Sequence, residues 1–413
     1  MFILRKNPKQ LNSQLNILLL ENISPEAVKV FHQNGFEKIT HLKTALSEEE
    51  LLGTIGNVDL LGIRSRTMIT KKVLDAAKRL IGIRCYCIGT DQVDIHAAMN
   101  KGVAVFNAPY SNTRSVAELV MGASIMLIRK IPEKNKLLHE RIWMKDASNS
   151  HELRGKTMGI VGYGNIGSQV SVMAESLGMK VIFYDSQKKL PLGNATAVEH
   201  LNELLRSADI ISIHTPAVED AINMINAETI LQCKKGAILI NYARGEVVDM
   251  NAVRSALETG LLSGAAFDVY PEEPSKNGEA FICPLQQMPN VLLTPHIGGS
   301  TVEAQVSAGL DVSNKLVQFA KKGTTAGSFS VQELTVPVQE NTHRILHIHK
   351  NVPGVLSEIN SRLSEHGINI LGQYLKTNQE IGYVVLDISH DASQNAADLL
   401  SHVKETIKVR LLY

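Results

Sequence analysis

The sequence predicts an α/β protein that is built mainly on parallel sheets and ends in a smaller domain with a different pattern. Three observations predict this fold class. Short apolar runs alternate with helical patterns from residue 16 to residue 294, which is typical of parallel sheets covered by helices on both faces. A glycine motif, residues 162–167, follows one of these runs. Beyond a stretch rich in glycine, serine and threonine, residues 321–328, the pattern changes to βαββαβ.

The alternation of apolar runs and helical patterns in residues 1–108 predicts a small doubly wound unit. Ser24 supplies an N-cap before a proline at the first helical position, and Ser47 begins a second helix before three glutamates. Further helices are expected near 71–78 and 94–100. They separate apolar runs that are expected to be buried parallel strands: 60–63, 80–87 and 103–106.

The glycine motif is predicted to join a strand, residues 157–161, to a helix that ends near Leu177. Its glycines are Gly162, Gly164 and Gly167. They allow a tight turn, close approach of the backbone to a pyrophosphate, and close packing of the helix on the strand. The helix N-terminus offers unpaired N–H groups and a partial positive charge to that pyrophosphate. The motif therefore predicts a Rossmann dinucleotide-binding domain.

Asp185 indicates which dinucleotide is bound. It ends the next apolar run, residues 179–184, where a carboxylate can bond the adenine-side ribose hydroxyls. The same negative charge would repel a 2′-phosphate. The sequence therefore predicts NAD rather than NADP as the cofactor.

The composition excludes several classes of partner. The 413 residues carry a formal net charge of +1 with acids and bases interspersed, so neither nucleic acid nor an anionic membrane is expected as a partner. The four cysteines show no CxxC pair and no disulfide-like spacing, as in a reducing compartment. No apolar stretch is long enough to span a bilayer, and the N-terminus lacks the pattern of a signal peptide. A soluble, cytoplasmic protein is expected.

Three polar residues, Arg244, Glu273 and His296, are predicted at strand ends after the glycine motif. Ligands of open parallel sheets bind outside the carboxyl ends of the strands, where these side chains would emerge. Oxidation of a secondary alcohol by hydride loss needs a base, and histidine has a suitable pKa. A carboxylate fixes the tautomer of that histidine, and an arginine can bind a substrate carboxylate. Each residue alone is more often structural, but the three together indicate a dehydrogenase.

Four segments resemble the D-isomer-specific 2-hydroxyacid dehydrogenase family: Gly162 to Gly167, Asn241 to Asp249, Asp268 to Pro274 and Thr294 to Ser300. Residues 63–67, 87–94 and 107–118 and the C-terminal unit are similar to the short bacterial branch of this family, which ends in an ACT domain. The resemblance covers nearly the whole chain. It implies oxidation of 3-phospho-D-glycerate to 3-phosphohydroxypyruvate with NAD, the first step of L-serine biosynthesis.

The resemblance also implies roles for individual residues. His296 is the acid/base, Glu273 is its partner, and Arg244 is the cation that orients the substrate. Tyr242 stands where a small residue is common, and little effect is expected because that position contacts the cofactor through its backbone. The implied cofactor-contacting positions are Gly162, Gly164, Asn165, Ile166, Gly167, Asp185, His214, Tyr242, Ala243, Arg244, Asp268, His296, Ile297, Gly298 and Gly299.

Arg64 and Arg66 are expected to bind the phosphate of the substrate. Two arginines spaced by two at a strand end point the same way, and a phosphorylated acid needs cations besides Arg244. From the residues alone, a solvated loop with surface ion pairs explains the pair equally well. The resemblance favours phosphate binding.

The C-terminal unit is expected to bind a regulator. His349 and Asn351 lie in a polar strand-to-helix turn, and Asn369 lies on the next expected strand. The resemblance to an ACT domain implies that these three residues bind L-serine as a feedback inhibitor between paired domains, in a homotetramer. A polar helix start is the simpler account of Asn351. His347 and His349 alternate on one strand face, but no further ligand is near and no metal is expected.

The expected organisation has three parts. Residues 1–108 and 299–330 form a flavodoxin-like substrate domain, residues 109–298 form the Rossmann domain inserted in it, and residues 339–413 form the ACT domain. Hydride transfer is expected in the cleft between the first two. Two other functions stay open: a dehydrogenase for another acid, such as 2-hydroxyglutarate or 2-oxoglutarate, hydroxypyruvate or glyoxylate, and an NAD-sensing, co-repressor-like binding protein.

Overall fold

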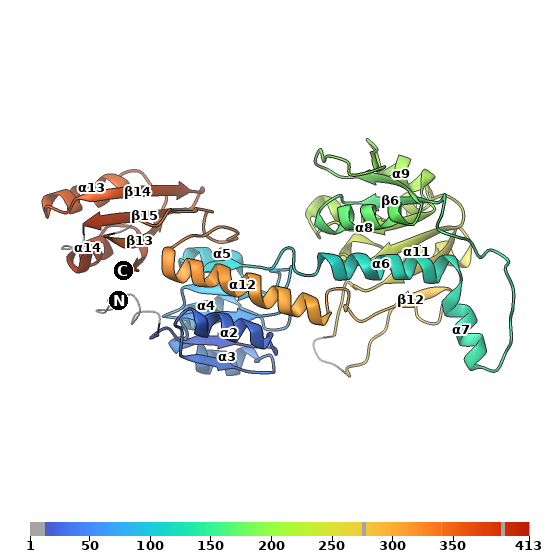
Figure 1. Ribbon diagram of the computed structural model, residues 1–413, viewed down its shortest axis with the longest axis horizontal. Coiled ribbons are helices and arrows are strands. Elements are labelled where there is room, and N and C mark those ends of the chain that lie inside the picture. The colour runs from blue at the N-terminus through green and yellow to red at the C-terminus, as the bar shows by residue number, and fades with distance from the viewer. Residues whose placement is uncertain (1–12, 275–277, 340, 390–392, 413) are drawn as a thin grey trace. The chain divides into compact units, whose positions relative to one another are not determined.

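The computed structural model describes residues 13–274, 278–339, 341–389 and 393–412 (Figure 1). The chain forms two compact units, Met1–Ser111 with Gln305–Tyr413, and Asn112–Ala304. The first unit contains a parallel and an antiparallel sheet, and the second contains a larger parallel sheet. The predicted α/β fold class is confirmed, whereas the predicted three-part division stays a prediction. The start of its first segment, residues 1–12, lies outside the described residues.

The parallel sheet of the first unit has the strand order β2-β1-β3-β4-β5. This order, 2-1-3-4-5, is that of a flavodoxin-like sheet. Short β2 was not among the predicted strands because Ile39-Thr40-His41 contains no apolar run. The strands are β1 (Ile17–Leu19), β2 (Ile39–His41), β3 (Leu60–Ile63), β4 (Gly82–Cys85) and β5 (Ala104–Phe106). The helices are α2 (Pro25–Gln33), α3 (Glu48–Thr54), η1 (Ile55–Asn57), α4 (Lys71–Ala76), α5 (Ile95–Asn100) and most of α12 (Val302–Lys322).

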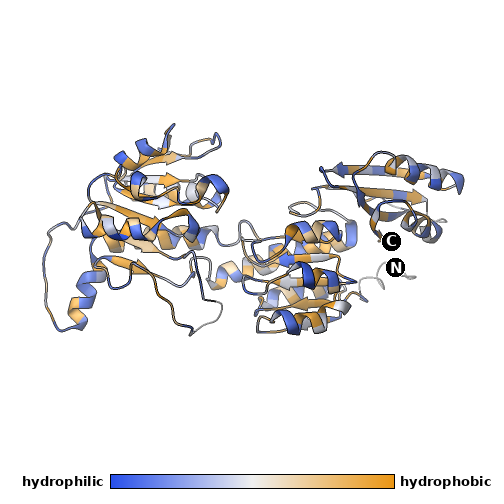
Figure 2. Cartoon of the chain, turned by 180° about the vertical axis from the view of Figure 1, so that it is seen from behind, coloured by the Kyte–Doolittle hydropathy of each residue, from blue (hydrophilic) through white to orange (hydrophobic). Residues whose placement is uncertain are grey.

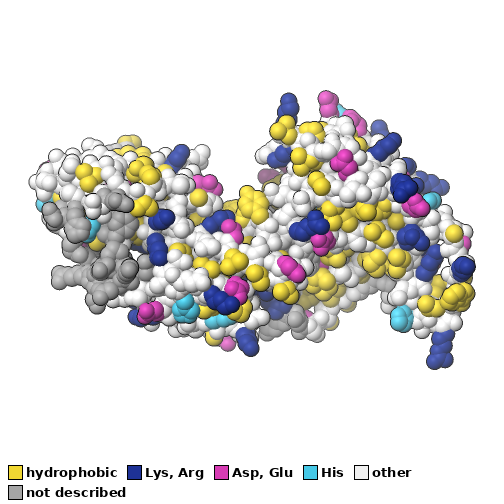
Figure 3. Space-filling view, viewed as in Figure 1, with side chains coloured by type: hydrophobic (Ala, Val, Ile, Leu, Met, Phe, Trp, Pro, Cys, Tyr) yellow, Lys and Arg dark blue, Asp and Glu magenta, His cyan; other side chains and the backbone are white. Residues whose placement is uncertain are grey.

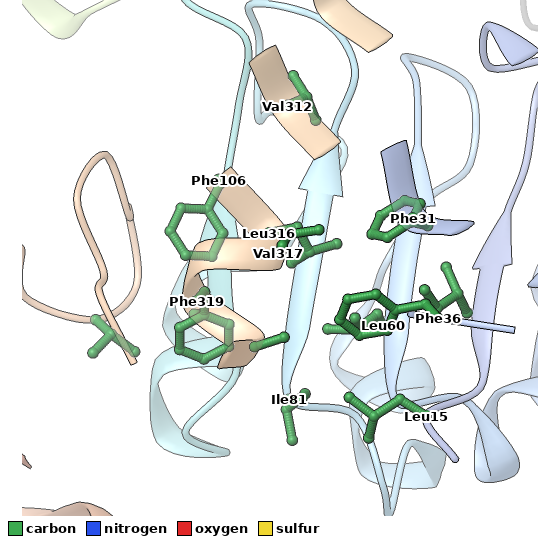
Figure 4. Close-up of a cluster of buried hydrophobic side chains, with 14 of the residues drawn as sticks. Leu15, Phe31, Phe36, Leu60, Ile81, Phe106, Val312, Leu316, Val317 and Phe319 are labelled. Carbon is green, nitrogen blue, oxygen red and sulfur yellow. The ribbon is translucent and has the colours of Figure 1, made fainter. Parts of the chain in front are cut away.

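Caps and core packing explain why these elements form. The Ser24 hydroxyl accepts an N–H at the start of α2, as predicted. Helix α3 also begins after Ser47 as predicted, and there Ser47 and Glu50 form a reciprocal capping box. Phe106 of β5 packs on Phe319 of α12, with ring centroids 5.5 Å apart (Figure 4). Burial of each such ring contributes roughly 1.5–3 kcal/mol. Helix α12 therefore belongs to the core of this sheet although it follows the whole second unit in sequence.

The sheet of the second unit is parallel, with the order β12-β11-β10-β9-β6-β7-β8. Its first strand in sequence, β6, lies inside the sheet, so the connections run in opposite directions from the β6/β9 pair, as in a Rossmann fold. Figure 2 shows hydrophobic strands between helices that carry both polar and apolar residues. The strands are β6 (Thr157–Val161), β7 (Lys180–Tyr184), β8 (Thr196–Ala197), β9 (Ile210–Ile213), β10 (Ala237–Asn241), β11 (Leu262–Phe267) and β12 (Val291–Leu293).

Helices and short helical turns connect these strands. Helix α7 ends at His139, and Arg141 shortly after it adopts a left-handed φ of 65° that a right-handed helix cannot accommodate. Among the described residues, no helix is both long and apolar enough to cross a membrane. The helices are α6 (Thr113–Ile128), α7 (Ile131–His139), α8 (Asn165–Ser176), α9 (Leu201–Ser207), η2 (Glu219–Ala221), α10 (Ala227–Ile230), η3 (Gly245–Val247) and α11 (Met250–Glu258).

The antiparallel sheet near the C-terminus has the order β14-β15-β13-β16. It is the predicted βαββαβ unit, and Arg344 pairs with Asp387 inside it through two hydrogen bonds of 2.7 Å. Its elements are β13 (Thr342–Lys350), α13 (Val355–Glu365), β14 (Ile370–Thr377), β15 (Ile381–Ser389), α14 (Ser393–Ser401) and β16 (Thr406–Leu411).

The stretch rich in glycine, serine and threonine, residues 321–328, is partly helical and well bonded. Its first two residues complete α12. Thr325 then donates its hydroxyl to the Gln332 carbonyl at 2.6 Å, and Ser330 bonds both the Val103 carbonyl and the Val105 N–H. The small polar residues here form hydrogen bonds that hold the backbone beside β5. The segment is therefore an ordered connection and not a flexible linker.

Candidate active site

Gly162 and Gly167 are required by the backbone geometry of the motif. Gly162 follows β6 with a φ of 94°, and a Cβ there would lie 2.8 Å from the backbone of His214. A Cβ on Gly167 would overlap the carbonyl of Gly162. Larger residues would push the first turn of α8 away from the sheet. The motif therefore brings the start of α8 close to the carboxyl ends of β6 and β9.

The N-terminus of α8 is suited to an anionic group. Gly164 is the N-cap residue and no side chain caps this end of the helix. A Cβ on Gly164 would meet nothing within 4 Å. Asn165 is exposed and Ile166 is half-buried beside it. These residues leave the first N–H groups of α8 open to a pyrophosphate, so the motif fits a dinucleotide.

Asp185 follows β7 directly and bonds the glycine motif. One carboxylate oxygen accepts the N–H of Tyr163 at 2.8 Å, and the other accepts the N–H of Gln187 at 2.9 Å. Each carboxylate oxygen can accept a second hydrogen bond. Asp185 can therefore brace the motif and still bond ribose hydroxyls.

His214 follows β9 and is uncharged. Burial lowers the pKa of this histidine to about 3. Its Nε2 lies 2.8 Å from the Ser212 hydroxyl. The imidazole is therefore neutral near pH 7, and it is the backbone of His214 that lies beside Gly162.

His296 and Glu273 form a hydrogen-bonded pair. The Nδ1 of His296 lies 2.7 Å from a carboxylate oxygen of Glu273, whose other oxygen accepts the N–H of Tyr270 at 3.1 Å. His296 adopts a left-handed φ of 53°. Because Nδ1 bonds the carboxylate, the remaining ring nitrogen, Nε2, is the one that can exchange a proton with a ligand.

Asp268 holds the backbone that carries His296. It follows β11 and is 2% exposed. Its carboxylate accepts the N–H groups of Ile297 and Gly298, at 2.8 and 2.7 Å, and the hydroxyl of Thr294 at 2.6 Å. Burial raises the pKa of Asp268, and these hydrogen bonds offset part of that effect. Asp268 thus positions the left-handed turn at His296.

Arg244 lies near enough to the His296–Glu273 pair for its charge to act on both residues. It follows β10 after Tyr242 and Ala243, and its guanidinium donates to the Ala243 carbonyl at 2.8 Å.

Glycines allow the loops of the site to pack closely. A Cβ on Gly245 would overlap the backbone of Tyr270 and Pro271, so the loop after β10 packs tightly on the loop after β11. Gly299 packs equally closely on the side chain of Asn112. Tyr242 is buried, so the unusual side chain points into the core.

The pKa values of the pair move in opposite directions. The hydrogen bond that His296 donates to the Glu273 carboxylate raises the pKa of His296 above its ordinary value, against burial and the charge of Arg244. Burial alone would raise the pKa of Glu273, but the hydrogen bond and charge of His296 outweigh it and the pKa is lowered. Each partner thus favours the charged form of the other.

The pH dependence of turnover is expected to follow from this coupling. Oxidation of an alcohol needs neutral His296, so kcat/KM should rise with pH through a pKa above 6.5, the ordinary value. Reduction needs the protonated ring and should fall through the same pKa. In Glu273→Gln the raising effect of the Glu273 charge is lost, while burial and the charges of Asp268 and Arg244 remain, so the rising limb should move to lower pH than in the wild type. Profiles of kcat/KM for both enzymes check this, and an unmoved limb would contradict it.

Arg64 and Arg66 lie in the first unit, directly after β3. The backbone N–H groups of Arg64, Arg66 and Thr67 all donate to the carboxylate of Glu21, at 3.1, 3.0 and 2.9 Å. The amide of Gln92 donates to the Arg64 carbonyl at 2.6 Å. The segment is therefore fixed by its backbone, and its arginines stand at the carboxyl edge of a parallel sheet.

The expected effector residues lie at two ends of the antiparallel sheet. His349 pairs with Gly382 across the sheet, whereas the carbonyl of Asn369 accepts the N–H of Ser389. These two points are separated by seven residues of β15, about 23 Å. One amino acid cannot touch both ends in a single chain.

The environments of these three residues also differ. His349 is 2% exposed, with its Nδ1 3.3 Å from that of His347, and burial lowers the pKa of both rings. Asn351 is exposed and donates to the Asn378 carbonyl at 2.6 Å, and Asn369 is exposed. Among the described residues, no group of three or more His, Cys, Asp or Glu side chains could hold a metal.

The second unit thus combines a dinucleotide motif with a histidine–carboxylate pair and an adjacent arginine, which defines a dinucleotide-dependent dehydrogenase of hydroxy acids. The family described as D-isomer specific 2-hydroxyacid dehydrogenase, NAD binding domain, matches residues 121–298. The family described as AHAS small subunit-like ACT domain matches residues 345–410.

Known proteins resemble the whole chain. It is 48% identical over 404 residues to the D-3-phosphoglycerate dehydrogenase of Haemophilus influenzae, covering 97% of this chain and 98% of that one. It is 46% identical over 402 residues to the D-3-phosphoglycerate dehydrogenase of Escherichia coli K12, covering 97% and 98%. The solved D-lactate dehydrogenase from Aquifex aeolicus, complexed with NAD and lactic acid, has a TM-score of 0.67 and 26% identity, covering 77% of this chain and 100% of that one.

The chain therefore belongs to the D-isomer-specific 2-hydroxyacid dehydrogenase family. It carries an NAD-binding domain and a C-terminal ACT domain, so the predicted family and cofactor are confirmed.

Sequence reasoning missed one residue beside the expected phosphate-binding arginines and part of the role of another. Glu21, which bonds the segment of Arg64 and Arg66, was not singled out. The available signal was an acid at the end of an apolar run, residues 17–20. Asp268 was assigned to the cofactor, and its bonds to Ile297 and Gly298 add a positioning role.

Proposed function

We propose that the protein is an NAD-dependent D-3-phosphoglycerate dehydrogenase, which oxidises 3-phospho-D-glycerate to 3-phosphohydroxypyruvate as the first step of L-serine biosynthesis. The observation that carries this proposal is the 2.7 Å hydrogen bond between His296 and Glu273 beside Arg244, in a unit with an NAD-binding motif. The relatives with this name, 46% and 48% identical, support the choice of substrate.

The chemistry follows from the three side chains. NAD, when bound, takes the hydride from the carbon that carries the hydroxyl group. Nε2 of His296 takes the hydroxyl proton, and Glu273 stabilises the imidazolium that results. Arg244 binds the substrate carboxylate through charge-assisted hydrogen bonds and so orients the reacting carbon. Gly162, Gly164, Gly167 and Asp185 would hold the pyrophosphate and the ribose.

The phosphate of the substrate is assigned to Arg64 and Arg66. Their shared backbone anchor and their place after β3 support this role. Two cations match a dianionic phosphate better than one, and a guanidinium matches its geometry.

The assay that tests the function is steady-state NADH formation with 3-phospho-D-glycerate and NAD, with and without millimolar L-serine. We expect saturable turnover and inhibition by L-serine. A panel with 2-hydroxyglutarate, D-glycerate and glycolate, and the reverse reaction with 2-oxoglutarate, hydroxypyruvate and glyoxylate, provides the comparison. A better substrate among these acids would favour the alternative dehydrogenase.

We further propose that L-serine binds at His349 and Asn351 of one chain and Asn369 of a second chain. The separation of these positions along β15 supports a site that two chains complete, and hence an oligomer. Hydrophobic side chains also gather on the face of the second unit that carries α6 and α8 (Figure 3), including Met126 and Val172. Such patches are typical of subunit interfaces. A homotetramer is the proposed assembly.

A cytoplasmic location is proposed as well. Cys85, Cys233 and Cys283 are free thiols. Proteins of a reducing compartment commonly keep their thiols in this form.

Asn351→Ala is expected to raise the L-serine concentration for half inhibition at least tenfold, with activity in the absence of serine within twofold of wild type. The amide lost is a ligand in the proposed effector site, far in sequence from the catalytic residues. Inhibition curves at a fixed concentration of 3-phospho-D-glycerate measure the effect. Asn360→Ala, on the exposed face of α13, is the control. Unchanged inhibition would exclude Asn351 from the site.

A further inference from the structure

Glu21 is a buried acid whose carboxylate contacts backbone alone among the hydrogen bonds described for it. It follows β1, is 6% exposed, and adopts a left-handed φ of 60°. One oxygen accepts the N–H groups of Arg64 and Thr67, and the other accepts the N–H of Arg66. Its own N–H donates to the Thr44 carbonyl at 3.0 Å. Both the acid and the segment that it bonds are thereby fixed.

The register of the sheet explains how the acid reaches this segment. Strands β1 and β3 are parallel neighbours, and Leu19 pairs with Gly62. Continuation of this register places Glu21 opposite Arg64. The acid therefore stands at the carboxyl edge of the sheet, where ligands of such folds bind.

A carboxylate suits these three donors better than a neutral group would. It presents only acceptors, on two oxygens, to N–H groups that approach from both sides. A glutamine in the same place could accept with one oxygen but would turn its own N–H₂ group toward the N–H of Arg66 or of the other two residues. Burying a donor against a donor is unfavourable.

The side chain of Gln92 also bonds the segment that carries Arg64 and Arg66. The Gln92 amide donates to the Arg64 carbonyl, and Gln92 is itself 6% exposed. The backbone around Arg64 is thus bonded at both N–H and C=O by buried groups. This fixes the direction in which the side chains of Arg64 and Arg66 leave the sheet.

We propose that Glu21 is a positioning residue for substrate binding, which presents Arg64 and Arg66 to the phosphate of the substrate through their backbone. The inference rests on the proposed function, because it takes the phosphate of 3-phospho-D-glycerate as the group that these arginines bind. Glu21 does not touch the substrate itself. Loss of the Glu21 carboxylate would make the positions of Arg64 and Arg66 less fixed and so weaken binding of the phosphate. It would have little effect on proton transfer at His296.

The test compares Glu21→Gln with a matched control, Asp59→Asn. Asp59 is a second buried carboxylate, 5% exposed, at the opposite end of β3. It accepts the N–H of Asn16 at 2.8 Å and pairs with Arg79 through two bonds of 3.0 Å, but does not contact residues 64–67 in the described bonds. Both substitutions remove one buried charge from the same parallel sheet, so general destabilisation should affect both.

The readout is the steady-state oxidation of 3-phospho-D-glycerate and of D-glycerate, which lacks the phosphate. In Glu21→Gln we expect KM for 3-phospho-D-glycerate to rise at least tenfold, with kcat and the dissociation constant of NADH within about twofold. The kcat/KM for D-glycerate should change less than twofold. Asp59→Asn should lower the midpoint of thermal unfolding but leave both KM values within twofold.

The outcomes separate the inference from the proposed function. Wild-type enzyme that does not oxidise 3-phospho-D-glycerate would overturn the function itself. An active wild type with unchanged KM in Glu21→Gln, equal losses for both substrates, or equal losses in Asp59→Asn would overturn the role of Glu21 alone. If Glu21→Gln does not fold, Glu21→Asp replaces it. That shorter acid should give a smaller rise in KM for the phosphorylated substrate, and no rise would contradict the proposal.

Discussion

His296→Ala is expected to lower kcat for oxidation of 3-phospho-D-glycerate by about 10²–10⁴-fold, the usual contribution of a positioned acid/base. The substitution removes the nitrogen that accepts the hydroxyl proton. It leaves Gly162, Gly164 and Asp185 in place, so the dissociation constant of NADH should stay within about threefold of wild type.

Stopped-flow single turnovers and a fluorescence titration with NADH measure the two quantities separately. His200→Ala, which removes an exposed histidine of the same unit, is the control and should behave as wild type. If His296→Ala kept more than a tenth of the activity, His296 would not be the acid/base. Wild-type protein that binds NADH but turns over no acid would instead favour the co-repressor-like alternative.

The positions of the proposed catalytic residues at strand ends could be predicted because their signal is local in sequence. Arg244 and His296 each follow an apolar run closely, and parallel strands present their carboxyl ends at one edge of a sheet. A strand assignment therefore also places the polar residue after it. The same reasoning located Asp185 after β7, and its bond to the N–H of Tyr163 agrees with that placement.

The interactions that position those residues could not be predicted, because they join backbone groups distant in sequence. The bonds from Ile297 and Gly298 to Asp268 depend on a left-handed turn at His296, which its side chain does not suggest. Glu21 bonds N–H groups more than forty positions away, and only the register of β1 on β3 brings them together. A sequence pattern indicates which face of a strand or helix is apolar. It does not indicate which hydrogen-bond donor meets which acceptor when the two are distant in sequence.

Short and irregular elements also could not be predicted from the sequence. Strand β2 is held by parallel pairing with β1, not by an apolar run of its own. The segment after α12 has the composition of a spacer, yet Ser330 joins it to β5 through two hydrogen bonds. In both places tertiary contacts decide the conformation, and local propensity is overridden.

Arg244→Ala is expected to lower kcat/KM for 3-phospho-D-glycerate by about 30–4,000-fold, since truncating one partner of a buried charge-assisted pair costs about 2–5 kcal/mol. The substrate carboxylate would lose its cation and the reacting carbon its orientation. Arg254→Ala is the matched control, because Arg254 pairs with Glu258 on the exposed face of α11. It should change kcat/KM less than twofold.

The pH profile of the same variant distinguishes a loss of binding from a general loss of structure. The charge of Arg244 lowers the pKa of His296, so its removal should move the rising limb of kcat/KM to higher pH, opposite to the shift expected for Glu273→Gln. Arg244→Lys keeps the charge but not the bidentate geometry. It should therefore retain the wild-type pH profile while kcat/KM stays reduced. A profile that moves to lower pH in Arg244→Ala would contradict the placement of Arg244 beside the catalytic pair.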